Sequence, residues 1–83
     1  MIHYKEKLHA IGNYLHDRFD FTWEFLDANV AHPDIILISE INVKVHYFAP
    51  TRKWVVTYDN SYHKFDTPMQ VINYIITRKY EVR

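Results

Sequence analysis

Residues 35–66 read IILISEINVKVHYFAPTRKWVVTYDNSYHKFD, and this stretch decides the fold because its apolar residues recur at every second position. That period is typical of β-strands, whose side chains alternate between the two faces of a sheet. A loop over 49–53 and a tight turn over 59–61 divide the stretch into three strands. The sequence therefore predicts a three-stranded antiparallel meander, with Asn60 in the left-handed conformation.

The register of this meander is predicted by pairing Phe48 with Trp54. That pairing collects aromatic and cationic side chains on one face, namely Lys44, His46, Phe48, Trp54, Tyr58, Tyr62 and Lys64. The other face then carries Ile41, Val43, Val45, Tyr47, Val55, Thr57 and Phe65. Because both faces are rich in apolar side chains, each is expected to pack against something.

The N-terminal part of the chain is predicted to be helical. Over residues 3–19, apolar side chains recur at spacings of three and four and form one narrow stripe, made of Tyr4, Leu8, Ile11, Leu15 and Phe19. Gly12 lies at the edge of this stripe, and since glycine disfavours a helix interior, its position predicts the close approach of another element. A short second helix is predicted from Trp23 to about Asn29, with Asp20 or Thr22 as its cap.

The C-terminal helix carries the clearest local signal in the chain. Thr67 supplies a capping hydroxyl, Pro68 occupies the first helical position, and Gln70 follows the cap by three residues. The sequence thus predicts one α+β domain over residues 1–83 with the order α-α-β-β-β-α. In this domain the C-terminal helix covers one face of the three-stranded sheet and the N-terminal helices complete the core.

Half of the first predicted strand has no partner within the meander. Residues 35–42 extend beyond the second strand, and they include the apolar run from Ile35 to Ile38. Exposed edge strands of this kind pair readily with other chains. Ile36 and Ile38 are therefore predicted as an edge that pairs with a second copy, as a homodimer edge, or with another protein. It is equally open that the N-terminal helices cover this segment, or that it is not a strand.

The composition disfavours several kinds of chemistry. The chain has no cysteine and therefore no thiolate site, and its single glycine is too few for a phosphate-binding loop. Neither Ser39 nor Ser61 lies in a nucleophile elbow, and the histidines do not come together at metal-ligand spacing. We therefore expect no catalytic residue, no metal and no cofactor, and the chain is predicted not to be an enzyme.

The sequence also carries no targeting signal. The N-terminal segment has charged residues within any apolar region, and no apolar run is long enough to span a bilayer. A cytoplasmic protein that does not contact a membrane is therefore expected.

The aromatic face is the predicted functional surface. Aromatic side chains mixed with a few charges are typical of the centres of protein interfaces, so a protein partner is expected on Lys44, His46, Phe48, Trp54, Tyr58 and Tyr62. Single-stranded nucleic acid could stack on the same face instead. The same residues could also join two copies of the chain, or the first helix could cover them. A self-assembling homodimeric structural protein, built through residues 35–40, is a third possibility.

The order α-β-β-β-α resembles the double-stranded RNA-binding domain. The lysine cluster and the glycine-rich hairpin of that family are missing from this chain, so none of the family's RNA contacts is expected here.

The segment from Trp54 to Pro68, followed by an isoleucine-rich helix, resembles small accessory proteins of phages and mobile elements in low-GC bacteria. Many such proteins occlude a host protein, including CRISPR effectors and other defence components. The resemblance implies a non-enzymatic inhibitor or regulator of a host protein.

Overall fold

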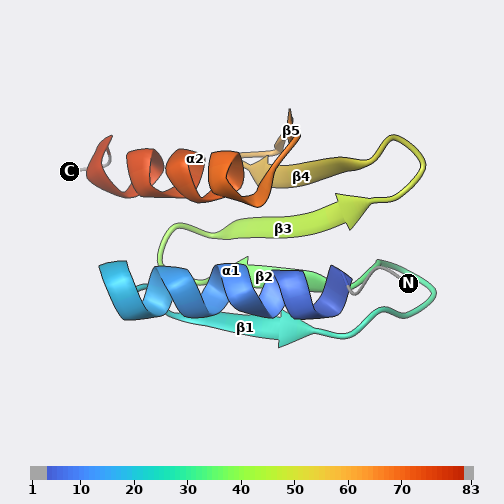
Figure 1. Cartoon of the computed structure of the whole chain (residues 1–83), viewed down its shortest axis with the longest axis horizontal. Helices are drawn as coiled ribbons and strands as arrows, with labels where there is room; N and C mark the ends of the chain where they lie inside the picture. The colour runs from blue at the N-terminus through green and yellow to red at the C-terminus, as the bar shows by residue number, and fades with distance from the viewer. Residues whose placement is uncertain (1–3, 82–83) are drawn as a thin grey trace.

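The computed structural model describes residues 4–81 of the 83-residue chain and shows two helices and one five-stranded antiparallel sheet (Figure 1). The elements follow the order α1 (Tyr4–Phe19), β1 (Trp23–Leu26), β2 (Ile35–Ile38), β3 (Val43–Phe48), β4 (Lys53–Tyr58), β5 (Ser61–Phe65) and α2 (Pro68–Glu81). Each strand pairs with its neighbours in the chain, so the sheet is a continuous meander from β1 to β5. The predicted α+β class is confirmed, while the predicted number of strands is too low.

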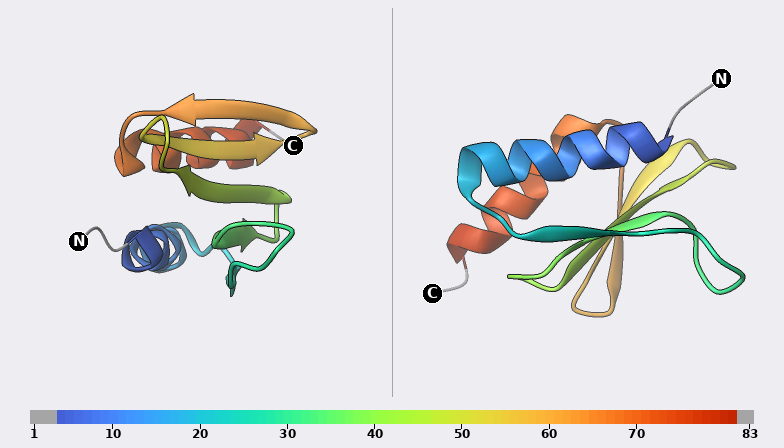
Figure 2. Two further views of the ribbon diagram at one scale, coloured as in Figure 1. Left: turned by 90° about the vertical axis from the view of Figure 1, so that its right-hand side faces the viewer. Right: turned by 90° about the horizontal axis from the view of Figure 1, so that it is seen from below.

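Both helices lie on the same face of the sheet, which makes the molecule a two-layer structure (Figure 2). α1 packs against β1, β2 and β3, while α2 packs against β4 and β5 and also touches α1. The residues between the layers form one core cluster, namely Leu8, Ile11, Leu15, Phe21, Ile36, Ile38, Val43, Val45, Trp54, Val56, Val71, Ile72 and Ile75. We call the side of the sheet that contacts the helices the helix face.

α1 approaches β1 unusually closely, and Gly12 makes this possible. A Cβ atom on Gly12 would lie 2.4 Å from two ring carbons of Trp23, which is far inside van der Waals contact. The expectation that another element comes close to Gly12 is confirmed, and that element is β1. Burial of Trp23 against the bare helix backbone offsets the cost of glycine in a helix.

The end of α2 is fastened to the rest of the helical layer by Lys79. Its Nζ donates a hydrogen bond to the carbonyl oxygen of Phe19 at 2.9 Å and lies 3.5 Å from the carboxylate of Glu40. The same ammonium group lies 4.4 Å from the ring centre of Phe21. Lys79 thus joins the last turns of both helices to the turn between β2 and β3, and its charge suits the C-terminal end of each helix.

Two local predictions are confirmed in detail. The Thr67 Oγ1 accepts a hydrogen bond from the Gln70 amide at 3.2 Å, and the Gln70 Oε1 accepts one from the Thr67 amide at 3.2 Å, which is a complete capping box. In the β4–β5 hairpin, Asp59 and Asn60 have φ angles of 53° and 62°. These angles are those of the two-residue turn that matches the right-handed twist of paired strands.

The predicted second helix is wrong, because residues 23–26 form strand β1. Trp23 and Phe25 point to the helix face opposite Ile38 and Ile36, while Glu24 points away. The spacing of Trp23, Leu26 and Val30 suits a helix, but Val30 is fully exposed and makes no inner side. What decides the conformation is α1, which offers His9 and Gly12 as a surface for the two rings.

The predicted dimer edge is also wrong. A turn over 39–42, with Asn42 at a φ of 51°, ends β2 after Ile38, and β2 pairs with β1 on one side and β3 on the other. Ile36 and Ile38 point to the helix face and are completely buried. They therefore belong to the core and present no edge to a second copy.

The register of the central hairpin differs from the predicted one by a single residue. Tyr47, and not Phe48, pairs with Trp54, because the connection has four residues and Lys53 already belongs to β4. The four-residue turn closes with a hydrogen bond from the Arg52 amide to the Ala49 carbonyl at 3.1 Å and a φ of 57° at Arg52. A one-residue shift moves every side chain of a strand to the other face, so the predicted faces are mixed.

Candidate functional site

The side of the sheet opposite the helices is not covered by any described helix or strand. We call it the open face. By alternation and register it carries Glu24, Leu26, Ile35, Leu37, Lys44, His46, Phe48, Lys53, Val55, Thr57, Tyr62 and Lys64. Six of these twelve side chains are hydrophobic, although both helices pack on the other side of the sheet.

The six predicted partner-binding residues do not share one face. Lys44, His46, Phe48 and Tyr62 lie on the open face, as the alternation of β3 and β5 requires. Trp54 and Tyr58 lie on the helix face. The prediction of a single surface made of all six residues is therefore wrong.

Trp54 and Tyr58 are held within the molecule. Trp54 is only 3% exposed and packs edge-on against Tyr47, with ring centres 4.9 Å apart. The ring of Tyr58 lies 6.4 Å from that of Tyr74 on α2. Trp54 is therefore not available to a partner, while Tyr58 is half-buried and packs toward α2.

An apolar row crosses the middle of the open face. Leu26 pairs with Ile35 and His46 pairs with Val55, and continuing the β2–β3 register places Ile35 opposite His46. Ile35 and Val55 are only 9% and 5% exposed, although no described helix covers them. The row ends on β5 at Lys64, which pairs with Val55.

His46 lies within this apolar row and is half-buried. Burial lowers the pKa of its imidazole below the ordinary value of 6.5, because the charged ring would lose its hydration. At neutral pH the ring is therefore uncharged. His46 thus adds an aromatic surface with hydrogen-bonding nitrogens and no charge to the centre of the open face.

Two aromatic rings project from opposite parts of the open face. Phe48 is 44% exposed at the end of β3, and Tyr62 is 72% exposed on β5, opposite Thr57. They are two strands and about four residues apart, a separation of roughly 16 Å. A partner that touches both rings would cover much of the apolar row between them.

The charges on the open face are mostly positive. Lys44 and Lys64 are exposed there, and Lys53 forms an ion pair with Asp66, which follows β5. Sequence reasoning missed the contribution of Leu37, Val55 and Lys53 to this face. For Val55 and Lys53 the missing signal is the length of the turn after Phe48, because that length decides which residues of β4 point outward. For Leu37 it is the turn over 39–42, which separates β2 from β3 and places Leu37 opposite Lys44.

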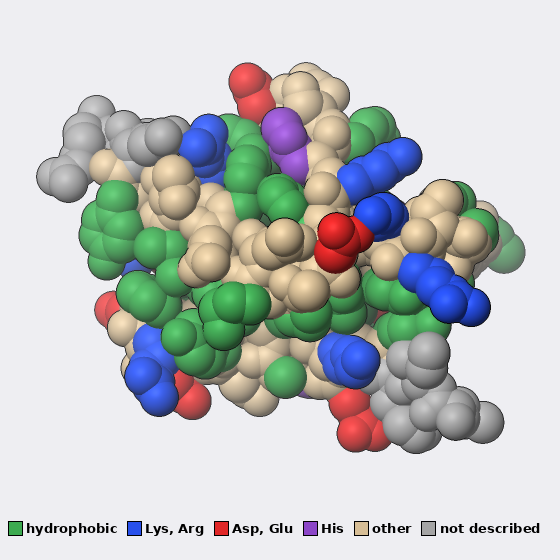
Figure 3. Space-filling model, turned by 45° about the horizontal axis from the view of Figure 1, so that its top comes forward, with side chains coloured by type: hydrophobic (Ala, Val, Ile, Leu, Met, Phe, Trp, Pro, Cys, Tyr) green, Lys and Arg blue, Asp and Glu red, His purple; other side chains and the backbone are tan. Residues whose placement is uncertain are grey.

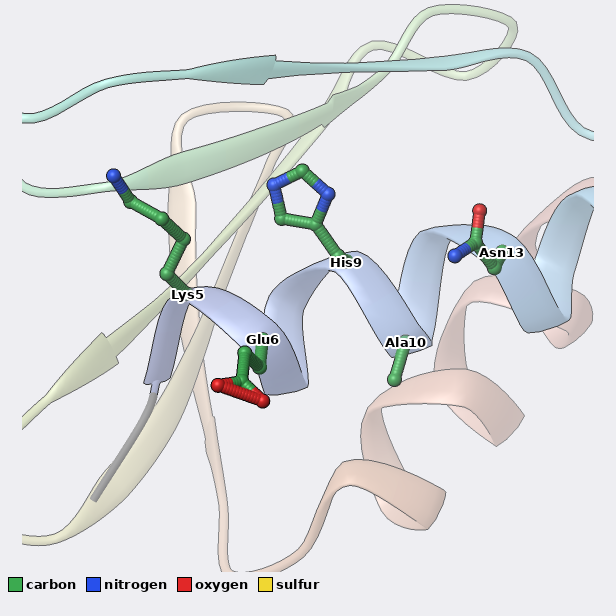
Figure 4. A pocket seen from close by; sticks show the side chains of 5 residues that line it. All are labelled: Lys5, Glu6, His9, Ala10 and Asn13. Atoms are coloured by element: carbon green, nitrogen blue, oxygen red, sulfur yellow. The ribbon is translucent and has the colours of Figure 1, made fainter. Parts of the chain in front are cut away.

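A shallow pocket of about 410 Å³ lies beside α1, lined by Lys5, Glu6, His9, Ala10 and Asn13 (Figure 4). The His9 ring packs edge-on against Trp23 at 5.5 Å between ring centres, and Lys5 forms a 3.2 Å ion pair with Asp27. The side chains that give the pocket its chemistry are therefore engaged in holding α1 to β1. Nothing among them makes a nucleophile paired with a base.

Histidines and carboxylates do not gather into a metal site within residues 4–81, where no group of three or more such residues is found. His46 and His63 point to opposite faces of the sheet, as the register requires. Within the same range, neither helix has the length and apolar character that a bilayer crossing needs. No family model matches the chain, and no curated protein or solved structure shows significant similarity to it.

Proposed function

We propose that this chain is a non-enzymatic protein-binding module that occludes a surface of its partner with the open face. The observation that carries the proposal is that both helices pack on one side of the sheet and leave Phe48 and Tyr62 exposed on the other. Antiparallel sheets commonly leave one face in water, but that face is then polar, whereas this one carries two exposed aromatic rings beside an apolar row.

The layout of the open face supports a protein as the partner. Its centre is an apolar row with a neutral histidine, its flanks carry two aromatic rings, and its rim carries lysines. Interfaces between proteins have this arrangement, with aromatic anchors inside a polar rim. The balanced charge of the whole chain also fits a protein partner better than a polyanion.

The resemblance to small phage and mobile-element proteins suggests a more specific form of this proposal. A phage-type inhibitor, present in the host cytoplasm, would use the open face to block a host defence protein. Surface occlusion requires no catalytic group and no cofactor. It requires only a rigid patch that fits the target, and a sheet backed by two helices supplies rigidity.

The test is a comparison of two double variants after the partner has been captured from the host and identified. Phe48→Ala with Tyr62→Ala removes both exposed rings of the open face. Met69→Ala with Tyr80→Ala removes two exposed apolar side chains of α2 and serves as the matched control. Calorimetry should show that the first pair weakens binding at least about thirtyfold, since aromatic anchors of an interface each contribute on the order of 1–2 kcal/mol. The control should change the affinity less than about threefold, and equal losses in both would contradict the proposal.

Nucleic-acid binding is the second candidate, because Lys44, Lys64 and the exposed rings share one face. Ionic strength separates the two candidates. Affinity that depends on phosphate contacts falls steeply between 50 and 200 mM salt, by roughly tenfold or more for a few contacts. For the protein interface we expect less than about a threefold change, so a steep dependence would favour nucleic acid instead.

A further inference from the structure

β5 forms one edge of the sheet, and its backbone is unpaired on the outer side. The sheet order places β4 on its inner side and no described strand on its outer side. The strand has five residues and no proline. Such an edge can accept another extended strand through main-chain hydrogen bonds.

The hairpin geometry shows which backbone groups face outward. In a hairpin with a two-residue turn, the residues that flank the turn exchange both main-chain hydrogen bonds, so Tyr58 and Ser61 form a bonded pair. Bonded and non-bonded pairs then alternate. Tyr62 and Lys64 belong to the non-bonded pairs and therefore direct their N–H and C=O groups away from β4.

A groove of about 320 Å³ lies beside this edge on the helix side, between β5 and α2. It is lined by Phe65, Gln70, Asn73, Tyr74, Thr77 and Arg78. The α2 residues recur at spacings of three and four, so the groove follows the flank of the helix. Every second side chain of a strand added to β5 would point toward this groove.

The charged residues beside the groove and on β5 indicate which side chains an added strand should carry. Arg78 is the one charged side chain among the described lining residues, and its guanidinium lies 4.9 Å from the ring centre of Tyr74. On the other side of the edge, Lys64 projects from β5. Figure 3, which turns the α2 and β5 side toward the viewer, shows apolar side chains among both basic and acidic ones. The acidic residues next to β5 in the sequence are Asp59 and Asp66 at its two ends, and Asp66 is paired with Lys53. The cations Lys64 and Arg78 therefore lie nearest the middle of the edge and the groove. Carboxylates would complement this surface.

We propose that β5 binds an extended acidic segment of a partner protein by strand addition, with an acidic side chain entering the groove next to Arg78. This inference goes beyond the open-face proposal, because it depends on the backbone of β5 and on α2. A second copy of this chain is a poorer occupant. Two-fold pairing of β5 with itself would bring the Arg78 and Lys64 of both copies to the same interface.

The other edge of the sheet is less suited to the same role. β1 has four residues, and the ion pair between Lys5 and Asp27 joins α1 to the residue that follows this strand. Lys5 also lies over the Phe25 ring at 5.5 Å. The shorter β1 thus offers fewer backbone groups to an added strand, and its end is joined to α1, whereas β5 is one residue longer and has no described strand on its outer side.

The experiment screens the full chain against a displayed library of random heptapeptides, in parallel with two variants. Lys64→Pro removes the outward N–H without removing a hydrogen bond within the sheet. Lys64→Ala keeps that N–H and removes only the charge. We expect enriched peptides with aspartate or glutamate at alternate positions, at least tenfold weaker binding to Lys64→Pro, and less than a threefold change for Lys64→Ala.

A blocked synthetic copy of the leading peptide then provides a measurement that does not depend on the proline variant. When it binds, amide hydrogen exchange at Tyr62 and Lys64 should slow at least tenfold, and N-methylation of alternate peptide amides should abolish the effect. Phe48→Ala should leave the affinity for the peptide unchanged. The result therefore tests strand addition to β5 separately from binding by the open face. Absence of an alternating acidic pattern, unchanged exchange at both residues, or a doubled molar mass of the chain alone would overturn the proposal.

Discussion

The two faces of the sheet are built from the same five strands, and they differ in what covers them. On the helix face, Val43, Val45 and Val56 are completely buried under two helices. On the open face, the intervening positions of the same sheet include Phe48 and Tyr62, which remain exposed. Residue type alone therefore does not separate core from binding surface in this chain. Register does, because it decides which aromatic rings meet the helices.

The largest effect is expected when one ring on each face is replaced, because the helix face is buried and the open face is not. Trp54→Ala removes a buried ring from the core and is expected to cost about 3–5 kcal/mol of unfolding free energy. Phe48→Ala removes an exposed ring and is expected to cost less than about 1 kcal/mol. Urea unfolding followed by circular dichroism measures both. Equal costs would mean that the two rings lie in equivalent environments, against the pairing of Tyr47 with Trp54.

A second substitution tests how closely the helix face is packed. Gly12→Ala places a methyl group within the Trp23 ring, so α1 and β1 must separate. We expect a loss of about 1–3 kcal/mol, although alanine favours a helix over glycine by about 1 kcal/mol. Asn13→Ala, at the exposed neighbouring position, is the control and should be neutral or slightly stabilising. A stabilising effect of Gly12→Ala would show that β1 does not approach the helix this closely.

The smallest expected effect is a pH dependence of the folding stability that comes from His46 on the open face. Because burial lowers its pKa, the folded chain binds fewer protons at this ring than the unfolded chain does below about pH 6.5. The stability that a neutral His46 contributes is thus fully present above pH 6.5 and is lost as the pH falls through the lowered pKa.

His46→Gln removes this titration and leaves the other histidines in place. Between pH 7.5 and 5, the melting temperature of the wild-type chain should fall further than that of the variant, by less than about 4 °C. Identical pH profiles would show that the ring is solvated, and therefore that the apolar row does not surround it.

The parts of the fold that depend on local chemistry could be predicted from the sequence. The capping box at Thr67, the left-handed Asn60 and the apolar stripe of α1 all follow from a few adjacent residues, and each is confirmed. Gly12 also correctly predicted that another element lies close to α1, because glycine destabilises a helix interior unless the space it leaves is used by a neighbour. Each of these patterns depends on residues that are close together in the sequence.

The parts that depend on distant contacts could not be predicted in this way. β1 forms a strand because α1 and β2 pack against it, while its own spacing also suits a helix. The faces of the sheet depend on a four-residue turn with Arg52 at a positive φ, which an arginine does not signal. Of the six residues predicted to bind a partner, four are on the open face because they alternate along β3 and β5, and the two on β4 are not.

Side-chain footprinting with hydroxyl radicals, on the free chain and on its complex with the captured partner, measures which rings are exposed and which of them the partner covers. In the free chain, Phe48 and Tyr62 should be oxidised readily and Trp54 should be protected. In the complex, Phe48 and Tyr62 should become protected while Met69 and Tyr80 on α2 stay reactive. Ready oxidation of Trp54 in the free chain, or protection of Met69 and Tyr80 with Phe48 and Tyr62 unchanged, would contradict the account.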